Sequence, residues 1–257
     1  MSLAYFVTGT DTGVGKTRVS TALLRALHRA GHARVVGMKP VAAGCEWVEA
    51  EDGRSGHWLN EDVAALRAAG TLAVPSQFDN PYALPDPVSP HIAARRAGEC
   101  IDLDHLESTF HALRQHADAV VVEGAGGFIV PLHDRDDDAS ADRDGPGWVT
   151  SADLAVRLRL PVILVVGLRL GCLNHALLSA EAIRADGLQL AGWVANTVDP
   201  AMACIEENID TLRQRLAAPL LGVVPWQRQG PDARAVVLEL PSAWTAPKDE
   251  HELVEGI

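Results

Sequence analysis

Hydrophobic and polar positions along the chain repeat one pattern, in which a short apolar run is followed by an amphipathic stretch with helical spacing. The apolar runs predict strands at residues 3–8, 34–38, 119–124, 161–167, 188–196 and 219–225. The helical spacing predicts helices at residues 16–30, 60–69, 103–116, 152–159, 172–186 and 201–217. Ser89 followed by Pro90 predicts the start of one further helix. Strands that alternate with helices indicate an α/β fold with a doubly wound, mainly parallel sheet and helices on both faces.

The connecting segments differ in composition from these elements. We expect a polar, glycine-rich loop from the second strand to about residue 57, and a structured proline-rich loop at residues 71–90. Residues 133–147 hold six Asp and two Arg, which predicts a solvated acidic insertion. The pattern predicts one domain over residues 1–227 and a weakly structured tail over residues 228–257.

Composition and charge exclude some classes of function. The chain has 257 residues, with 34 acidic and 22 basic side chains and a net charge of −12, which argues against a nucleic-acid partner. No apolar stretch is long enough to cross a membrane, and the N-terminus lacks the features of a signal peptide. The cysteines lack CxxC or zinc-like spacing. We therefore expect a cytoplasmic protein with reduced thiols.

Residues 9–17, GTDTGVGKT, join the first strand to the first helix, which is the context of a phosphate-binding loop. Glycines let backbone N–H groups turn toward phosphate oxygens, and the helix N-terminus adds a positive dipole. Lys16 is placed to reach the β- and γ-phosphates, and Thr17 to offer its hydroxyl to Mg²⁺. The spacing is irregular, because Thr10 stands where the usual pattern has its first glycine. A plain glycine-rich turn is the alternative.

Polar residues follow three other predicted strands, where open α/β sheets bind ligands. Lys39 follows the second strand and is either a positioned cation or a surface lysine. Glu123 closes the strand at residues 119–124 and is either a Mg²⁺ ligand or a strand-end cap. Asp62 is a second candidate carboxylate, or an acid in the first turn of a helix. Asn196, with Thr197, is suited to read an adenine edge, or serves a turn.

Several segments together resemble the dethiobiotin synthetase family. They occur in the family's order over about residues 3–226: YFVTGTDTGVGKT (5–17), KPVAAG (39–44), NPYALPDPVSPHIAA (80–94), VVEGAGG (121–127), PVILVVGLRLGCLNHA (161–176), LAGWVANTV (190–198) and APLLGVVPW (218–226). The irregular phosphate-binding loop is the family's own form. The irregular spacing therefore supports both the phosphate-binding loop and the resemblance to this family.

The resemblance implies a reaction and its participants. The family closes the ureido ring of dethiobiotin from 7,8-diaminononanoate, CO₂ and ATP, with Mg²⁺, in biotin biosynthesis. One amine takes up CO₂ as a carbamate, the carbamate attacks the γ-phosphate of ATP, and the second amine closes the ring and expels phosphate. The family works as a homodimer.

The resemblance also implies roles for individual residues. Lys16 and Lys39 are the expected catalytic groups, and Thr17, Asp62 and Glu123 the expected Mg²⁺ ligands. ATP is expected to contact Gly13, Val14, Gly15, Lys16, Thr17, Arg18, Asp62, Glu123, Gly124, Ala125, Gly126, Asn196, Thr197, Pro225, Trp226 and Gln227. The diamine is expected to contact Thr12, Lys39 and Ala43 in one subunit and Gly171, Cys172, Leu173 and Asn174 in the other.

The chain departs from the family pattern at two substrate positions. Ala43 stands where the family often has Ser, and Asn208 aligns with a Tyr of some members. Each change removes or replaces one hydrogen bond, worth about 1 kcal/mol.

The main alternative is a switch ATPase of the ParA/MinD type, but Asp11 stands where those proteins have a signature lysine, and the tail is acidic. A related amidating ligase would need a glutaminase region with a reactive Cys. A homologue that has lost catalysis is disfavoured, because the expected catalytic and metal-binding residues Lys16, Thr17, Lys39 and Glu123 are present.

Overall fold

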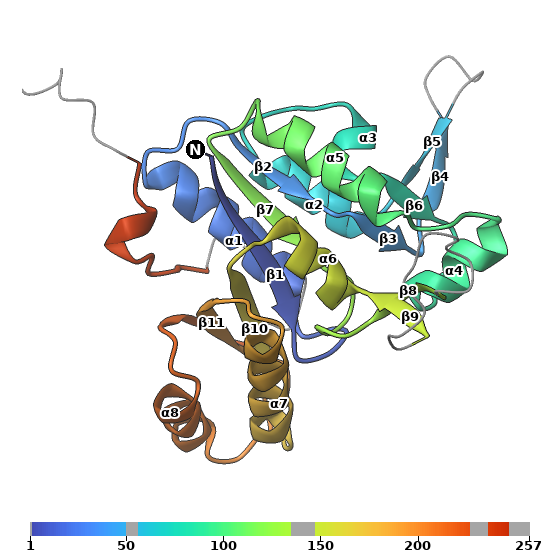
Figure 1. The fold of residues 1–257 in the computed structure, drawn as a ribbon. Helices are drawn as coiled ribbons and strands as arrows, with labels where there is room; N and C mark the ends of the chain where they lie inside the picture. The colour runs from blue at the N-terminus through green and yellow to red at the C-terminus, as the bar shows by residue number, and fades with distance from the viewer. Residues whose placement is uncertain (1, 50–55, 135–146, 227–235, 247–257) are drawn as a thin grey trace, which may run out of the picture.

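The computed structural model describes residues 2–49, 56–134, 147–226 and 236–246. A six-stranded parallel sheet runs through the centre in the order β12-β11-β10-β1-β7-β2. Figure 1 labels β1, β2, β7, β10 and β11 of this sheet. Its strands are β1 (Leu3–Gly9), β2 (Val35–Met38), β7 (Ala119–Glu123), β10 (Val162–Leu168), β11 (Leu190–Thr197) and β12 (Leu220–Val224). The six strands predicted from apolar runs are confirmed, and so is the doubly wound α/β fold.

Strand β1 lies between β10 and β7, and its register fixes where the loops of the sheet meet. Val7 is opposite Ile163 on one side and Glu123 on the other. Because all these strands are parallel, their carboxyl ends lie at one edge of the sheet. The loop that follows β1 therefore begins beside the last residue of β7.

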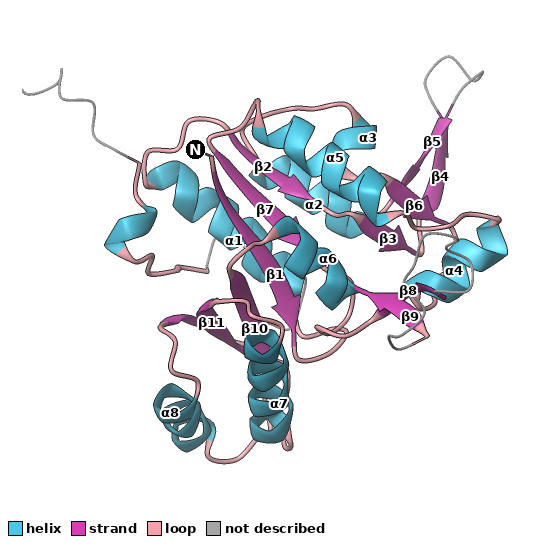
Figure 2. Cartoon of the chain, in the orientation of Figure 1, coloured by secondary structure: helices cyan, strands magenta, loops and turns pink. Residues whose placement is uncertain are grey.

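Helices cover both faces of the sheet (Figure 2). The helices α1 (Lys16–Arg29) and α2 (Glu61–Ala69) contribute to one buried cluster, with Tyr5 and Val7 of β1. The other cluster contains Ala4 and Phe6. Its helices include α5 (Leu103–Arg114), α6 (Ser151–Leu158), α7 (Cys172–Ala185) and α8 (Ile205–Arg215). The side chains of β1 thus alternate between two cores, and each large one that is fully buried stabilises the fold by roughly 1.5–3 kcal/mol.

The expectation of a loop between β2 and about residue 57 is wrong, since this segment contains strands. They are β3 (Val41–Ala43), which pairs with β6 (Tyr82–Leu84), and the hairpin of β4 (Glu46–Glu49) and β5 (Gly56–Leu59). The hairpin projects from the body of the molecule (Figure 1). Trp47 and Trp58 are opposite each other with ring centroids 5.4 Å apart, and cross-strand aromatic pairs stabilise such exposed strands.

The remaining short elements lie between β5 and α6. They are α3 (Ser76–Asp79), α4 (Pro90–Ala97) and an unpredicted hairpin of β8 (Pro131–Asp134) and β9 (Trp148–Thr150). Ser89 is the N-cap residue of α4 as expected, although its side chain makes no capping hydrogen bond. The helix predicted at residues 201–217 begins later, at Ile205, because Cys204 adopts a left-handed conformation with φ 55°.

Part of the C-terminal segment packs against the first elements of the chain. Trp244 is in a short 3-10 helix, Ser242–Trp244, and its ring centroid lies 4.1 Å from that of Tyr5. Val236 and Leu238 are buried in the same cluster. The rest of the predicted tail, and residues 135–146 of the predicted acidic insertion, lie outside the described residues.

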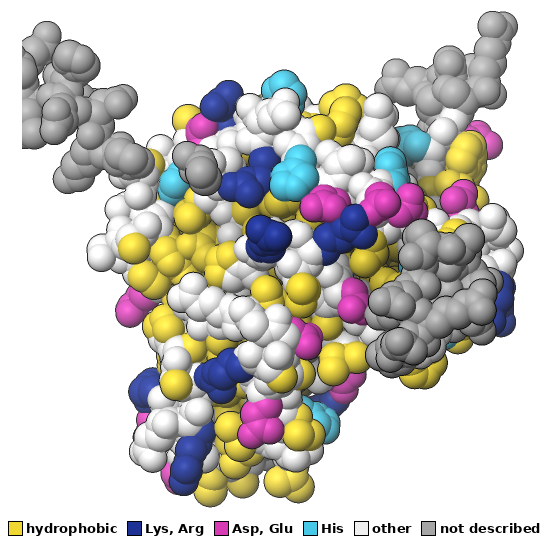
Figure 3. All heavy atoms as spheres, in the orientation of Figure 1, with side chains coloured by type: hydrophobic (Ala, Val, Ile, Leu, Met, Phe, Trp, Pro, Cys, Tyr) yellow, Lys and Arg dark blue, Asp and Glu magenta, His cyan; other side chains and the backbone are white. Residues whose placement is uncertain are grey.

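The surface carries charges of both signs. On the face seen in Figure 3, basic and acidic side chains are interspersed, which is common for protein surfaces. Among the helices of the described segments, none is both long enough and apolar enough to span a membrane.

Candidate active site

The loop after β1 leads directly into α1, and glycines shape its backbone. Gly13 and Gly15 have φ values of 74° and 87°, in the left-handed region that favours glycine. A Cβ atom on Gly15 would lie 2.3 Å from Nδ2 of Asn196, so a side chain has no room there. The loop therefore brings the N-terminus of α1, with its first N–H groups and positive dipole, to the edge of the sheet.

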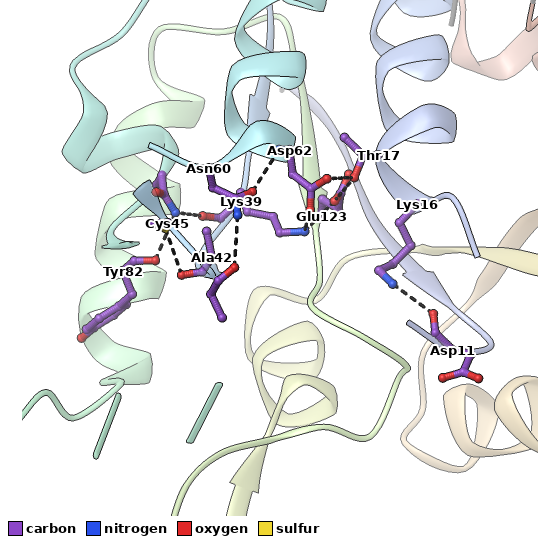
Figure 4. Close-up of polar contacts among 12 residues, drawn as sticks. Asp11, Lys16, Thr17, Lys39, Ala42, Cys45, Asn60, Asp62, Tyr82 and Glu123 are labelled. Atoms are coloured by element: carbon purple, nitrogen blue, oxygen red, sulfur yellow. Dashed lines mark hydrogen bonds and ion pairs between the residues drawn. The ribbon is translucent and has the colours of Figure 1, made fainter. Parts of the chain in front are cut away.

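Lys16, the first residue of α1, folds back over this loop. Its Nζ donates a hydrogen bond to the backbone oxygen of Asp11 at 3.1 Å, and the side chain is buried (Figure 4). Burial, and secondarily the nearby charge of Lys39, lower the pKa of Lys16 from 10.5 to about 8. Asp11 points its carboxylate away from Lys16, toward the guanidinium of Arg169. Lys16 is thus a buried cation whose charge is poorly compensated in the protein alone.

A cluster of four side chains, each from a different segment of the chain, lies beside Lys16 (Figure 4). The hydroxyl of Thr17 is 2.6 Å from Oδ1 of Asp62 and 2.8 Å from Oε1 of Glu123. Nζ of Lys39 donates to Oδ2 of Asp62 at 2.9 Å and to Oε1 of Glu123 at 2.6 Å. The structure therefore brings predicted residues of α1, α2 and β7, and the residue that follows β2, together in one network.

Charges within this cluster support one another. Burial alone lowers the pKa of Lys39, but the carboxylates of Glu123 and Asp62 outweigh it, and the pKa is raised overall. Burial raises the pKa of Asp62, and Lys39 with the Thr17 hydrogen bond outweighs it, so the pKa is lowered. Lys39 is therefore charged, and Asp62 is ionised, at neutral pH.

The same cluster provides oxygen atoms for a small, hard cation. Oε2 of Glu123 is buried and has no hydrogen-bond partner among the described residues. A buried carboxylate oxygen without a partner is costly unless another group satisfies it. One hydroxyl and two carboxylates are the kind of ligands that Mg²⁺ takes beside phosphates. The residues at this site thus fit the ion that the sequence predicts.

The backbone of Lys39 is held by residues that sequence analysis did not single out. Its N–H donates to the backbone oxygen of Asp79 at 2.7 Å, and its carbonyl accepts from Nδ2 of Asn80 at 2.8 Å. The Asp79 carboxylate accepts two hydrogen bonds from Arg67 of α2, at 2.6 and 2.7 Å. These contacts join segments far apart in the chain, so only the position of Asn80 before Pro81 hinted at a structured turn.

The ends of β11 and β12 form the other side of the phosphate-binding loop. Nδ2 of Asn196 donates to the backbone oxygen of Val14 at 2.7 Å, while Oδ1 is buried and has no hydrogen-bond partner among the described residues. Arg18 donates to the backbone oxygen of Pro225 at 3.2 Å. Asn196 and Pro225 therefore lie on the α1 side of the sheet edge, and Thr197 and Trp226 follow them directly in the chain. Gln227 lies outside the described residues.

The glycine-rich segment after β7 runs beside the same loop. The N–H of Gly124 donates to the backbone oxygen of Val7 at 3.0 Å. Gly126 has φ 63°, and a Cβ atom there would be 3.4 Å from the hydroxyl oxygen of Thr12. Thr12 and residues 124–126 are therefore neighbours, as the predicted shared site requires.

The predicted diamine-binding residues fall in two places. Ala43 ends β3, and its backbone oxygen accepts a hydrogen bond from Asn60 at 3.1 Å. Gly171 has φ 95° and precedes α7, whose first residues are Cys172, Leu173 and Asn174. Leu170, just before them, is 95% exposed. Asn208 donates its amide to the backbone oxygen of Cys204 at 2.7 Å within α8.

Comparisons with known proteins decide the family. A family model described as an AAA domain matches residues 4–233. The ATP-dependent dethiobiotin synthetase BioD of Aromatoleum aromaticum is 54% identical over 222 residues, which cover 86% of this chain and 90% of that protein. The enzyme of the same name from Xanthomonas axonopodis pv. citri is 52% identical and covers 93% of this chain and 98% of that protein. The chain belongs to the ATP-dependent dethiobiotin synthetases.

Family membership confirms the resemblance inferred from the order of motifs. The protein is accordingly an ATP-binding ligase of biotin biosynthesis. Among solved structures, a ParA family ATPase from Chlorobium tepidum TLS is 12% identical with a TM-score of 0.49, and the match covers 89% of this chain and 86% of that one.

Proposed function

We propose that this dethiobiotin synthetase carboxylates 7,8-diaminononanoate with CO₂ and closes the ureido ring at the expense of ATP, releasing ADP and phosphate. The observation that carries the assignment of residues is the network of Thr17, Lys39, Asp62 and Glu123 beside the phosphate-binding loop. With Lys16 of the neighbouring loop, the site combines two cations and two carboxylates near the N-terminus of α1. That combination suits transfer of a γ-phosphoryl group to an anionic acceptor.

ATP binds in this proposal with its phosphates on residues 13–18 and its base toward Asn196, Thr197 and residues 225–227. Backbone N–H groups of the loop and Lys16 contact the phosphate oxygens. The unpartnered Oδ1 of Asn196 supports the adenine assignment, because an amide oxygen accepts the hydrogen bond of an exocyclic amine. Residues 124–126 close the site from the β7 side.

Thr17, Asp62 and Glu123 would hold Mg²⁺. When bound, the ion neutralises charge on the β- and γ-phosphates and helps to orient them. The partnerless Oε2 of Glu123 supports this assignment.

The chemistry depends on positioning and charge rather than on a covalent enzyme intermediate. One substrate amine adds to CO₂, loses a proton and becomes a carbamate. A carbamate oxygen then forms a bond to the γ-phosphorus as the bond to ADP breaks. The second amine attacks the carbonyl carbon of the mixed anhydride, releases its proton and expels phosphate. Lys16 and Lys39 hold the γ-phosphate and the carbamate close together, although both are anions.

The diamine is proposed to lie between Lys39, Thr12 and Ala43, with its carboxylate at residues 171–174 of a second subunit. The N-terminus of α7 supports this role, since it presents backbone N–H groups to an anion. The proposed homodimer would also cover Leu170, which is 95% exposed, and Leu178, which is 56% exposed. Asp11, at the position of the signature lysine of switch ATPases, contacts Arg169 and argues against that alternative.

A mass-spectrometric assay tests the proposal directly. The purified protein is incubated with 7,8-diaminononanoate, bicarbonate, ATP and Mg²⁺. The expected product is heavier than the diamine by one carbonyl group and lighter by two hydrogens, and it forms only with ATP. ATP hydrolysis without this product would reject the substrate assignment and leave the phosphate site standing.

A further inference from the structure

Asn60 makes two different contacts with its one amide side chain. It is the N-cap residue of α2, where Oδ1 accepts a hydrogen bond from the N–H of Asp62 at 2.9 Å. Its Nδ2 group donates to the backbone oxygen of Ala43 at 3.1 Å. Figure 4 places Asn60 beside Lys39 and Asp62. A capping role alone would need only the oxygen atom.

The two contacts join the two halves of the proposed site. Asp62 belongs to the carboxylate cluster, through Lys39 and Thr17. Ala43 ends strand β3, and Gly44 follows it with φ 75°. Between Ala43 and Asn60 the chain leaves the body as the β4–β5 hairpin (Figure 1). The bond from Asn60 to Ala43 therefore closes the base of this hairpin.

We infer that Asn60 is a positioning residue that holds the substrate-side strand β3 in a fixed place relative to the carboxylate of Asp62. The inference rests on the proposed function, since it takes Ala43 as part of the diamine site. Asn60 and Asp62 are two residues apart at the start of α2 and are joined by the capping hydrogen bond, so their relative positions are fixed by the helix. Without the bond to Ala43, the end of β3 keeps its pairing with β6 and the bond from the N–H of Gly44 to Asp86 but loses its direct link to α2, so its place relative to Asp62 is less well fixed.

The two contacts of Asn60 can be separated by substitution. Asn60→Ser and Asn60→Asp both keep an oxygen that caps α2, because Ser and Asp are good N-cap residues. Neither keeps the donor to Ala43, since a serine side chain is too short and a carboxylate has no N–H. Asn60→Ala removes both contacts.

We expect Asn60→Ser and Asn60→Asp to raise KM for the diamine about fivefold to tenfold, the loss of one net hydrogen bond. The Mg²⁺ concentration for half-maximal activity and the KM for ATP stay within twofold of wild type. Asn60→Ala should raise both the diamine KM and the Mg²⁺ requirement, because Asp62 loses its support as well.

Asp102 provides a matched control. It caps α5 in the same way, accepting from the N–H of Asp104 at 2.8 Å, on a helix that carries none of the proposed site residues. Asp102→Ala should lower the thermal midpoint as Asn60→Ala does, while both KM values stay unchanged.

Steady-state kinetics of these four variants, with thermal unfolding of each, test the inference. An unchanged diamine KM in both Asn60→Ser and Asn60→Asp overturns it, and so does an equal rise in Asp102→Ala. If the wild-type protein forms no dethiobiotin at all, the proposed function fails first, and the inference falls with it.

Discussion

Replacing Lys39 by Met tests the centre of the proposed site. Met has a similar length and volume, so the substitution removes the ammonium group with little loss of packing. The side chain of Lys39 is 6% exposed, and its partners Glu123 and Asp62 are 0% and 34% exposed. The variant therefore leaves one fully buried carboxylate and one partly screened carboxylate without their common cation.

Two effects of different size follow from this geometry. Breaking a buried ion pair by removing one partner costs about 3–5 kcal/mol of stability, and the screened carboxylate of Asp62 places the expected loss at the lower end of that range. Removing one preorganised charge from a transition state costs about 10²–10³-fold in turnover. ATP affinity should change little, because the phosphate-binding loop and Lys16 are untouched.

Three measurements separate these effects. Calorimetry gives ATP affinity, the mass-spectrometric assay gives turnover, and thermal unfolding is recorded with and without Mg²⁺. Mg²⁺ should recover part of the lost stability, because it neutralises the same carboxylates. Arg96→Met serves as the control, since its ion pair with Asp86 is exposed and such pairs contribute roughly 0–1 kcal/mol. Turnover within threefold of wild type in the Lys39→Met protein would refute the role assigned to Lys39.

Three further predictions follow from the same structure. Since burial lowers the pKa of Lys16 to about 8, this group loses its proton as pH rises through 8, and the ATP affinity measured by calorimetry should fall between pH 7 and pH 9. The Lys16→Gln protein should show no such pH dependence. A wild-type ATP affinity that stays constant over this range would contradict the role assigned to Lys16. Gly15→Ala should abolish ATP binding, because the added Cβ atom has no room beside Asn196. Gly187→Ala is the control: Gly187 has φ 74° and open space around it, so the substitution should cost only about 1–2 kcal/mol of backbone strain. Equal ATP affinity in both variants would contradict this reasoning. Trp244→Ala should cost about 3–5 kcal/mol of unfolding free energy with unchanged KM values, and a loss below 1 kcal/mol would show that the segment is dispensable.

The central sheet could be predicted from sequence because its strands are apolar runs, most of them buried. Val35–Met38, Ala119–Glu123 and Val162–Leu168 are buried along their whole length, so hydrophobicity alone marks them. The hairpin of β4 and β5 escaped prediction because most of its residues are exposed, and its stability comes from the pairing of Trp47 with Trp58. Cross-strand pairing of this kind leaves no periodic signal in one strand alone.

The site could be predicted in part for a similar reason. The phosphate-binding loop is a continuous segment, and Lys39 and Glu123 are each marked by the strand that precedes them. The supporting residues carry no such mark. Asp79 holds Lys39 through a backbone oxygen, which any residue provides, and Arg67 supports Asp79 across a turn of irregular structure. Asn60 has the sequence of an ordinary helix N-cap, and its second contact depends on where β3 ends.

The central position of β1 has a consequence for how the protein acquires its activity. Tyr5 of β1 is paired with Val121, and Phe6 with Val162, so β1 gains its neighbours only after more than 100 further residues have been made. Parallel pairings between such distant segments form slowly, because loop closure precedes any gain from contacts. Until then, the apolar side chains of β1 and α1 remain available to chaperones or to aggregation. The ATP site, which unites residues of α1, β2, α2 and β7, is therefore assembled late, and recovery of ATP binding during refolding should report completion of the central sheet.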